Sequence, residues 1–543
     1  MLTVIALMLK SGSQSASRSY PVEPEQPQQT PAEFRYSCYT LSILMLVYIV
    51  NFIDRQILAI LNEEIKGDLG LTDAQMGFLY GTAFAVFYAL FCIPLGRLAD
   101  VWVRRTLVAY AVAFWSLATA MSGFARNFFE LGAARIAVGV GEAATGPCAY
   151  SLLSDSFVPA RRATVIAILT SGVFVGAGLG IFIGGQVVQR WNDAFPLGNA
   201  PFGLAGWQVA FFVIGLPGLL LAIWVRTLRE PPRGTMDGII SPPEPHPFRE
   251  FGAELFAVLP GLSVFNLYRR GASRRALAGN LLALVGLALV AWALIRTLGN
   301  PAQWIALAIG FYATVSWAQG LVLRDPPTAT LILKSRSWVL FVLGISMLAF
   351  STYGLGYFTA PFFIRYHGVP IGELGFTLGG ITAAFGFLGV TTGGIAADYW
   401  RKRHPCGRLY VAIIAALAPI PVGLWMLYTT STNLAFLLNA VVAFTGAAWL
   451  GVGGSTVTDL VLPRMRGSAT ALYILALTLL GQAIGPFTVG LISDLTGELR
   501  NGLVAALLVN IGAAILIALA SRYLQEDERT LRERARRAGE SGL

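Results

Sequence analysis

The stretch GRLADVWVRR, residues 96–105, joins two long apolar runs, and GGIAADYWRKR, residues 393–403, joins two others. The matching positions are Gly96 with Gly394 and Asp100 with Asp398, both at an offset of 298. Further along, SDSFVPARRA at 154–163 matches TDLVLPRMRG at 458–467 at an offset of 304. Nearly equal offsets at separate places indicate that the chain contains two related halves.

The composition is that of a membrane protein. Of the 543 residues, 55% are hydrophobic and 13% are charged, against about 45–50% and about 25% in a soluble domain. The net charge of +10 comes from basic residues in short loops, as the positive-inside rule produces. We therefore expect no nucleic-acid partner. The four cysteines fit no metal site and no disulfide framework.

Apolar runs long enough to cross a bilayer fall into two sets of six, with two more between them. The first set lies at about 38–61, 75–98, 105–124, 128–150, 162–186 and 206–227, and the second at about 338–362, 372–397, 408–429, 432–455, 467–491 and 501–520. The extra pair lies at about 277–298 and 302–323. We predict an all-α polytopic membrane protein of about 14 spans, with two parallel six-helix repeats and an inserted two-helix hairpin.

Arginine and lysine are concentrated in alternate loops and in the C-terminal tail, which places both termini in the cytoplasm. Only four of the 39 basic residues are Lys, a bias typical of GC-rich bacteria, so we expect a bacterial inner-membrane protein. The predicted parts are a disordered cytoplasmic tail (1–36), an N-terminal bundle (37–230), a linker with an amphipathic segment and the hairpin (231–335), a C-terminal bundle (336–521) and a basic cytoplasmic tail (522–543). The hairpin is either a spacer or a partner-binding or regulatory element.

The repeated loop resembles the signature of the major facilitator superfamily between spans two and three. That resemblance implies a cytoplasmic gate latch, in which glycine permits close helix approach and the acid is held by basic residues. The candidate gate residues are Gly96, Asp100, Arg104, Arg105, Gly394, Asp398 and Arg401. The alternative is a positive-inside loop with a helix-capping acid. Glycines at steps of four from 172 to 184 predict close helix packing, or a hinge together with Pro486 in span eleven.

Four ionisable residues lie well inside the spans, namely Asp54, Arg55, Arg135 and Glu142. Asp54 and Arg135 lie at about the same depth, so we expect them to pair, whereas Arg55 is left freer to meet an anionic substrate. Asp54, Glu142 and Arg135 then form a proton relay, because an arginine that changes partners changes the proton affinity of a buried acid. The alternative is a static ion pair between spans one and four.

The stretches NFIDRQILAI, GVGEAATGPCAYSLLSD and GWQVAFFVIGLPGLL, with the REPPRG after the last, resemble the Spinster family within that superfamily. The resemblance implies proton-linked export of a lipid-like substrate of the lysolipid class. Expected substrate contacts are Arg55, Asn51, Tyr80, Phe84, Tyr357, Trp449 and Gln482.

Two alternatives to lipid export remain, a transporter of small organic anions or drugs and a transport-inactive membrane sensor or scaffold. The chain contains no catalytic motif in a plausible context, so we expect no enzyme. We also expect no cofactor and no metal. The expected partners are the bilayer, protons and the substrate, and the protein is expected to be a monomer.

Overall fold

The computed structural model describes residues 29–196, 199–237, 244–269 and 271–540, and these ranges contain helices and loops without a strand. The N-terminal half comprises α2 (Pro31–Ile60), α3 (Asn62–Leu69), α4 (Asp73–Tyr80), α5 (Thr82–Val101), α6 (Arg104–Ser122), α7 (Phe128–Glu142), α8 (Thr145–Ser156), α9 (Pro159–Ala194), the short η1 (Pro201–Gly203) and α10 (Gly206–Arg226). The linker comprises η2 (Thr235–Asp237), α11 (Pro247–Val258), α12 (Leu262–Arg269), α13 (Arg274–Leu298), α14 (Pro301–Arg324) and α15 (Pro326–Leu333).

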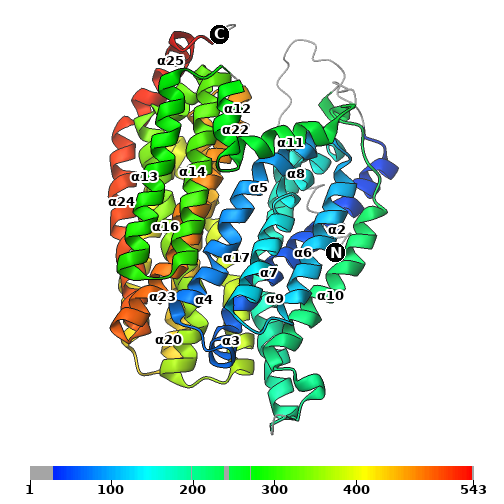
Figure 1. Cartoon of the computed structure of the whole chain (residues 1–543), viewed down its shortest axis with the longest axis vertical. Coiled ribbons are helices and arrows are strands. Elements are labelled where there is room, and N and C mark those ends of the chain that lie inside the picture. Colours follow the sequence, from blue (N-terminus) through cyan, green and yellow to red (C-terminus); the bar gives the residue numbers. More distant parts are fainter. Residues whose placement is uncertain (1–28, 197–198, 238–243, 270, 541–543) are drawn as a thin grey trace.

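The C-terminal half repeats this plan. It comprises α16 (Arg336–His367), α17 (Ile371–Arg403), α18 (Gly407–Leu417), α19 (Pro419–Tyr428), α20 (Thr432–Ala447), α21 (Leu450–Asp459), η3 (Pro463–Met465), α22 (Arg466–Ala476), η4 (Leu477–Ala483), α23 (Ile484–Thr496), α24 (Leu499–Arg529) and α25 (Leu531–Arg537). The two halves stand side by side (Figure 1) and meet along two seams, α4 against α23 and α9 against α17. We call the end that carries α11 and α25 the linker end and the opposite end the α3 end.

The structure supports fewer membrane spans than the 14 that the sequence predicts. Among the described residues, twelve helices or helix pairs are long and apolar enough to cross a membrane, or up to 13 if α11 and α12 form one broken span. Both hairpin helices are among them, whereas α6, α7 and α8 are not. The reason is local, since α6 begins with two arginines and the 15-residue α7 carries Arg135 and ends at Glu142.

The first helix begins earlier than predicted. A capping box at Thr30 and Glu33, followed by Pro31, starts α2 before the predicted boundary at residue 37. Residues 1–28 of the predicted disordered tail and residues 541–543 of the basic tail lie outside the described residues.

The predicted glycine stripe of span five lies against span one. A Cβ added at Gly176 or Gly180 would lie 2.4 Å from the carbonyl oxygen of Ile49 or 2.8 Å from that of Ile53. Intervening glycines face the other half, because a Cβ at Gly178 would lie 2.4 Å from the carbonyl oxygen of Gly379. Small residues on two faces of α9 therefore let it pack closely on α2 and α17 at once.

The α4–α23 seam combines glycines with an irregular helix. Span eleven contains the π-helical turn η4, which ends three residues before Pro486. Thr82 Oγ1 donates to the carbonyl of Ala483, the last residue of η4, at 2.7 Å across the seam. Beside it, a Cβ at Gly77 would lie 2.4 Å from the carbonyl oxygen of Pro486.

We expect Gly490→Val to prevent the halves from closing at the α3 end. A Cβ at Gly490 would lie 2.2 Å from the carbonyl oxygen of Asp73, a backbone atom that cannot move away cheaply. Spin labels at Gly67→Cys and Glu498→Cys, measured by double electron–electron resonance, should be further apart in Gly490→Val than in the protein without it. Gly380→Val is the matched control because no atom lies within 4 Å of its added Cβ. An unchanged distance in Gly490→Val would contradict the requirement for close approach.

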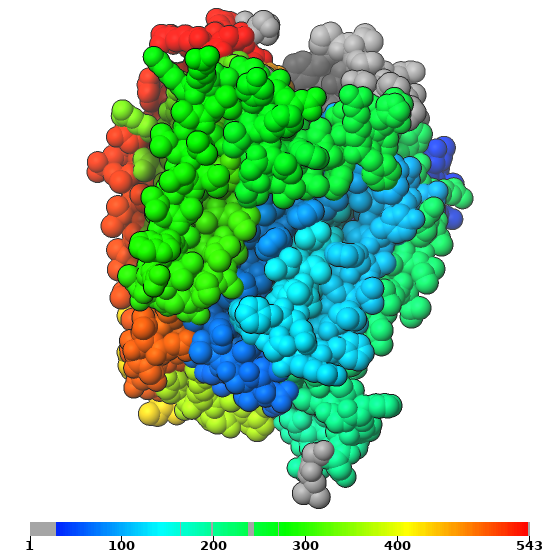
Figure 2. Space-filling view, viewed as in Figure 1, coloured from blue at the N-terminus to red at the C-terminus, as the bar shows by residue number. Residues whose placement is uncertain are grey.

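The inserted hairpin packs over the α4–α23 seam. Its helix α14 contacts α5 of one half and η4 of the other, and in Figure 2 the green hairpin lies beside the orange and blue segments of the two halves, which remain visible below it. Trp304 packs edge-to-face on Phe487 with ring centroids 5.3 Å apart. Within the hairpin, Tyr312 donates to Asn280 at 2.6 Å and Asn280 donates to Ser316 at 2.9 Å. These bonds satisfy the polar groups that lie between its two helices.

Candidate functional site: a buried charge cluster beside a central cavity

Arg55 and Glu142 form an ion pair between α2 and α7. The Nε atom of Arg55 donates to Oε2 of Glu142 at 2.6 Å, and the two side chains are 15% and 0% exposed. The prediction that Arg55 would be the freer of the two α2 charges is therefore wrong. The physical reason is that α2 directs Arg55 toward Glu142, the last residue of α7.

Aromatic rings surround the Arg55 guanidinium. Its carbon Cζ lies 4.9 Å from the ring centroid of Phe52, 4.5 Å from that of Phe84 and 4.9 Å from that of Tyr88. Cation–π contacts of this kind stabilise a desolvated guanidinium. Phe84, predicted as a substrate contact, is fully buried and serves here as a ring against Arg55.

Asp54 and Arg135 lie close together but do not form the predicted ion pair. Nη1 of Arg135 donates to the backbone carbonyl of Asp54 at 3.4 Å. Both carboxyl oxygens of Asp54 are fully buried without a hydrogen-bond partner. Asp54 is oriented toward Trp115 and Thr119 of α6, whose side-chain donors are likewise buried without a partner. Their equal depth in the membrane correctly predicted that the two residues lie close together, but it did not predict the direction in which either side chain points.

A cavity of about 740 Å³ lies between the halves. Its walls come from α2, α4 and α9 on one side and from α16, α17, α20, α21 and α24 on the other. Two predicted contacts, Tyr80 and Trp449, line it, together with Phe52 and Gln56 next to the charge cluster. The other predicted contacts, Asn51, Arg55, Phe84, Tyr357 and Gln482, are outside its lining in this conformation.

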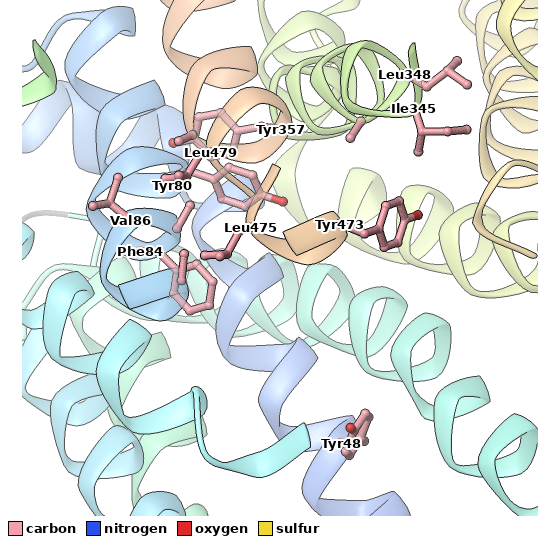
Figure 3. Close-up of a cluster of buried hydrophobic side chains, with 14 of the residues drawn as sticks. Tyr48, Tyr80, Phe84, Val86, Ile345, Leu348, Tyr357, Tyr473, Leu475 and Leu479 are labelled. Atoms are coloured by element: carbon pink, nitrogen blue, oxygen red, sulfur yellow. The ribbon is translucent and has the colours of Figure 1, made fainter. Parts of the chain in front are cut away.

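Two tyrosines close the cavity toward the α3 end. The rings of Tyr80 and Tyr357 stack with centroids 4.2 Å apart and an angle of 20° between their planes, as Figure 3 shows. Tyr80 also donates from its hydroxyl to Gln56 at 2.9 Å. Because Tyr80 belongs to α4 and Tyr357 to α16, the stack joins the two halves.

An ion-pair network holds the halves together at the α3 end, and we call it the Arg365 latch. Arg365 of α16 donates from Nη1 and Nη2 to the two carboxyl oxygens of Asp73 at 2.7 and 2.6 Å. The same guanidinium binds Glu63 at 2.7 Å. Lys66 and Ser493 also donate to Asp73, both at 2.6 Å. The sequence analysis did not predict this latch, because Arg365 and its partners are about 300 residues apart in the chain.

The Arg365 latch is accompanied by two equivalent caps across the seams. Asp494 of α23 accepts from the backbone N–H groups of Asp73 and Ala74 at 3.0 and 2.8 Å. At the other seam, Gln189 of α9 accepts from the backbone N–H of Gly372 at 3.4 Å. Gln189 and Asp494 differ by 305 residues, close to the offset of the repeat. That offset is the sequence signal that could have found them.

The predicted gate residues form ion pairs at the linker end. Arg104, fully buried, binds Asp155 and also Glu230, the latter at 2.8 Å. In the C-terminal half Arg408 binds Asp459, and both members lie 304 residues after Arg104 and Asp155. Arg408 is therefore the counterpart of Arg104, and sequence reasoning missed it.

The remaining gate residues are placed as follows. Arg401 binds Glu528 at 2.7 Å and Asp398 accepts from Arg408 at 3.2 Å. The backbone N–H of Arg105 donates to Glu230 at 3.0 Å, and Asp100 is exposed. Close helix approach occurs at Gly393, where a Cβ would lie 2.3 Å from the carbonyl oxygen of Ala448, and at Gly394, whose Cα would lie 3.0 Å from a Cβ on Gly451, but not at Gly96.

Comparison with known proteins gives a consistent result. Residues 44–486 match the Major Facilitator Superfamily. An MFS-type efflux pump of Mycolicibacterium smegmatis is 24% identical over 89% of this chain and 91% of its own. Protein spinster homolog 1 of Xenopus tropicalis is 27% identical over 86% of this chain and 74% of its own. The crystal structure of a bacterial homologue of the human lysosomal transporter Spinster, inward-facing and occupied, has 25% identity and a TM-score of 0.65 over 91% of this chain and 98% of its own.

Proposed function

This chain belongs to the Major Facilitator Superfamily and is Spinster-like, and on that basis we propose that it moves a small amphipathic or anionic, lipid-like substrate of the lysolipid class by proton-coupled alternating access. Membership makes it a multi-pass secondary transporter and not an enzyme. The observation that carries the coupling is the Arg55–Glu142 ion pair, buried next to the cavity wall.

We assign the linker end to the cytoplasm and the membrane to a bacterial inner membrane. The basic gate loops and the arginine-rich α25 support this orientation. The Arg365 latch and the tyrosine stack then close the outer side, which corresponds to an inward-facing state. The proposed gate latch forms in that scheme when the linker ends of the two halves approach.

We propose that the hairpin helices and the α6 and α7–α8 segments all cross the membrane, giving 14 spans. The exposed apolar side chains of α13, among them Leu282 and Trp292, suit a lipid-facing helix. A single cysteine at Gly299, between the hairpin helices, should react with an impermeant maleimide added outside intact cells. A cysteine at Arg274 should react only after permeabilisation. The reverse pattern would contradict the proposed topology.

Proton binding to Glu142 would remove one charge of the pair and release Arg55. Phe52 and Gln56, on either side of Arg55 in sequence, already line the cavity, so a released guanidinium is near the substrate space. An arginine there offers N–H donors to acceptor oxygens of a substrate headgroup. Arg135 is the charge that remains beside Asp54 and continues the proposed relay.

Reconstituted proteoliposomes test this function directly. A panel of lysolipids and small organic anions should include a substrate whose flux follows an imposed proton gradient. Organic anions alone would favour the alternative substrate class. Flux that ignores the gradient would exclude proton coupling, and failure across the panel would leave the sensor or scaffold interpretation.

A further inference from the structure

The lining of the central cavity is uncharged. Among the residues that the structure places in its wall there is no Asp, Glu, Lys, Arg or His. The charged cluster lies behind this wall, with Arg55 neutralised by Glu142 at 2.6 Å. A charged headgroup in the cavity would therefore lose its hydration without meeting an opposite charge, which is unfavourable.

The polar side chains of the wall include two kinds, those that already have a hydrogen-bond partner and those with unused capacity. The first kind includes the hydroxyls on α9, since Thr170 donates to the carbonyl of Ile166 at 2.9 Å and Ser171 to that of Ile168 at 2.7 Å. Such bonds to the carbonyl of the preceding turn leave little demand for another partner.

The second kind lies in the C-terminal half and has unused hydrogen-bonding capacity. Asn510 of α24 is 2% exposed, and its Oδ1 atom has no partner. Ser351 of α16 is also 2% exposed, with an unpartnered Oγ. Both line the cavity, as does the 8% exposed Asn439 of α20. A buried polar group without a partner costs roughly 1–3 kcal/mol.

The surroundings of these three residues suit an amphiphile. Trp449 also borders the cavity and donates from Nε1 to Thr352 at 3.2 Å, which fixes its ring. The α9 and α17 parts of the wall include the apolar side chains of Phe174, Ile181 and Leu378. A volume of about 740 Å³ lies within the roughly 300–1,000 Å³ of small-molecule sites.

We propose that Ser351, Asn439 and Asn510 form a subsite for an uncharged headgroup that carries hydroxyl or amide groups, with the acyl part of the ligand against α9 and α17. This inference rests on the proposed transport function and narrows its substrate class. The two amide groups supply donors and acceptors, and the serine hydroxyl can both donate and accept a hydrogen bond. An anionic headgroup would use only the donors and would leave the acceptor atoms unpaired.

Binding of two ligands that share an acyl chain tests the proposal. Tritiated 1-decanoylglycerol and 1-decanoyl-lysophosphatidate differ by the phosphate, and a scintillation proximity assay on protein in nanodiscs compares their affinities. We expect the glycerol ester to bind more tightly. Asn510→Leu should weaken its binding roughly 10-fold and Ser351→Ala roughly 3-fold, as loss of one or two hydrogen bonds predicts.

Ser346→Ala is the matched control, because Ser346 lies on the same helix, is equally buried and donates to the carbonyl of Val342 at 2.8 Å, outside the cavity wall. Asn439→Leu provides a second variant if Asn510→Leu fails to fold. Tighter or equal binding of the lysophosphatidate, or unchanged affinity in the polar variants, would overturn the subsite.

Transport separates this inference from the proposed function. If the glycerol ester binds as expected but no substrate follows a proton gradient, coupled transport fails and the subsite stands. If a lysophosphatidate is driven by the gradient equally well in wild type and in Asn510→Leu, the subsite fails and coupled transport stands.

Discussion

Glu142→Gln should abolish proton-driven transport while leaving the cavity intact. The amide keeps the shape of the side chain, but Arg55 loses its buried counter-ion, and breaking such a pair costs about 3–5 kcal/mol. We expect a large fall in thermal stability and a fall in proton-driven flux of at least about tenfold, the factor that about 1.4 kcal/mol produces. Differential scanning fluorimetry and flux in proteoliposomes between pH 5 and 8 measure the two effects.

The double variant Arg55→Gln with Glu142→Gln distinguishes coupling from folding. Replacing both members of a buried ion pair often restores stability, so the double variant should regain much of its melting temperature but not its pH dependence. Glu130→Gln is the matched control, since Glu130 lies on the same helix but is exposed at its start. If Glu142→Gln and Asp54→Asn both keep the wild-type pH dependence, the relay is wrong and the cluster is a static lock.

The repeat made much of the architecture predictable. The offset of 304 in sequence corresponds to equivalent ion pairs in space, because Arg104–Asp155 in one half matches Arg408–Asp459 in the other. Hydropathy located the spans, but several helices extend beyond the predicted ends: α2 starts early at the Thr30 capping box, and α9 and α24 continue to Ala194 and Arg529. Intramembrane charge identified all four members of the cluster, since such residues are rare at that depth.

The pairing within the cluster could not be predicted, because it depends on the rotation of each helix. Neighbouring residues on a helix point about 100° apart, so a small error in rotation exchanges the partners of Asp54 and Arg55. Whether Glu142 at the end of α7 meets Arg55 or another residue of α2 depends on how the two helices pack. Depth along the helix axis is readable from the sequence, whereas facing direction requires the packed neighbours.

The polar groups of the cavity wall could not be predicted either. Sequence reasoning assigned the headgroup to the charges of the N-terminal half, since charge is the strongest signal in an apolar chain, and of its expected contacts in the C-terminal half only Trp449 lines the cavity. The unpartnered groups of Ser351 and Asn510 are uncharged, and serine and asparagine in a span are common enough to carry no signal alone. Only burial and the absence of a partner distinguish them.

Arg365→Ala should open the α3 end and shift the protein away from the conformation described here. The substitution removes the bidentate contact to Asp73 and the contact to Glu63, leaving Asp73 2% exposed on its side chain. Hydrogen bonds to charged groups contribute about 1.5–3 kcal/mol each. These bonds exist only when the halves meet, so their loss favours the open state.

Distances between spin labels at Gly67→Cys and Glu498→Cys measure the opening, and we expect the open population to rise by at least about tenfold, equivalent to about 1.4 kcal/mol. The open population of Arg365→Lys should lie between those of wild type and Arg365→Ala, because lysine retains the charge but cannot make the bidentate contact. Arg500→Ala is the control, since Arg500 stacks on Tyr366 at 4.1 Å within the same half. If Arg365→Ala and Arg500→Ala give the same distance distribution, the Arg365 latch does not set the equilibrium, and the Tyr80–Tyr357 stack and glycine contacts hold the α3 end closed by themselves.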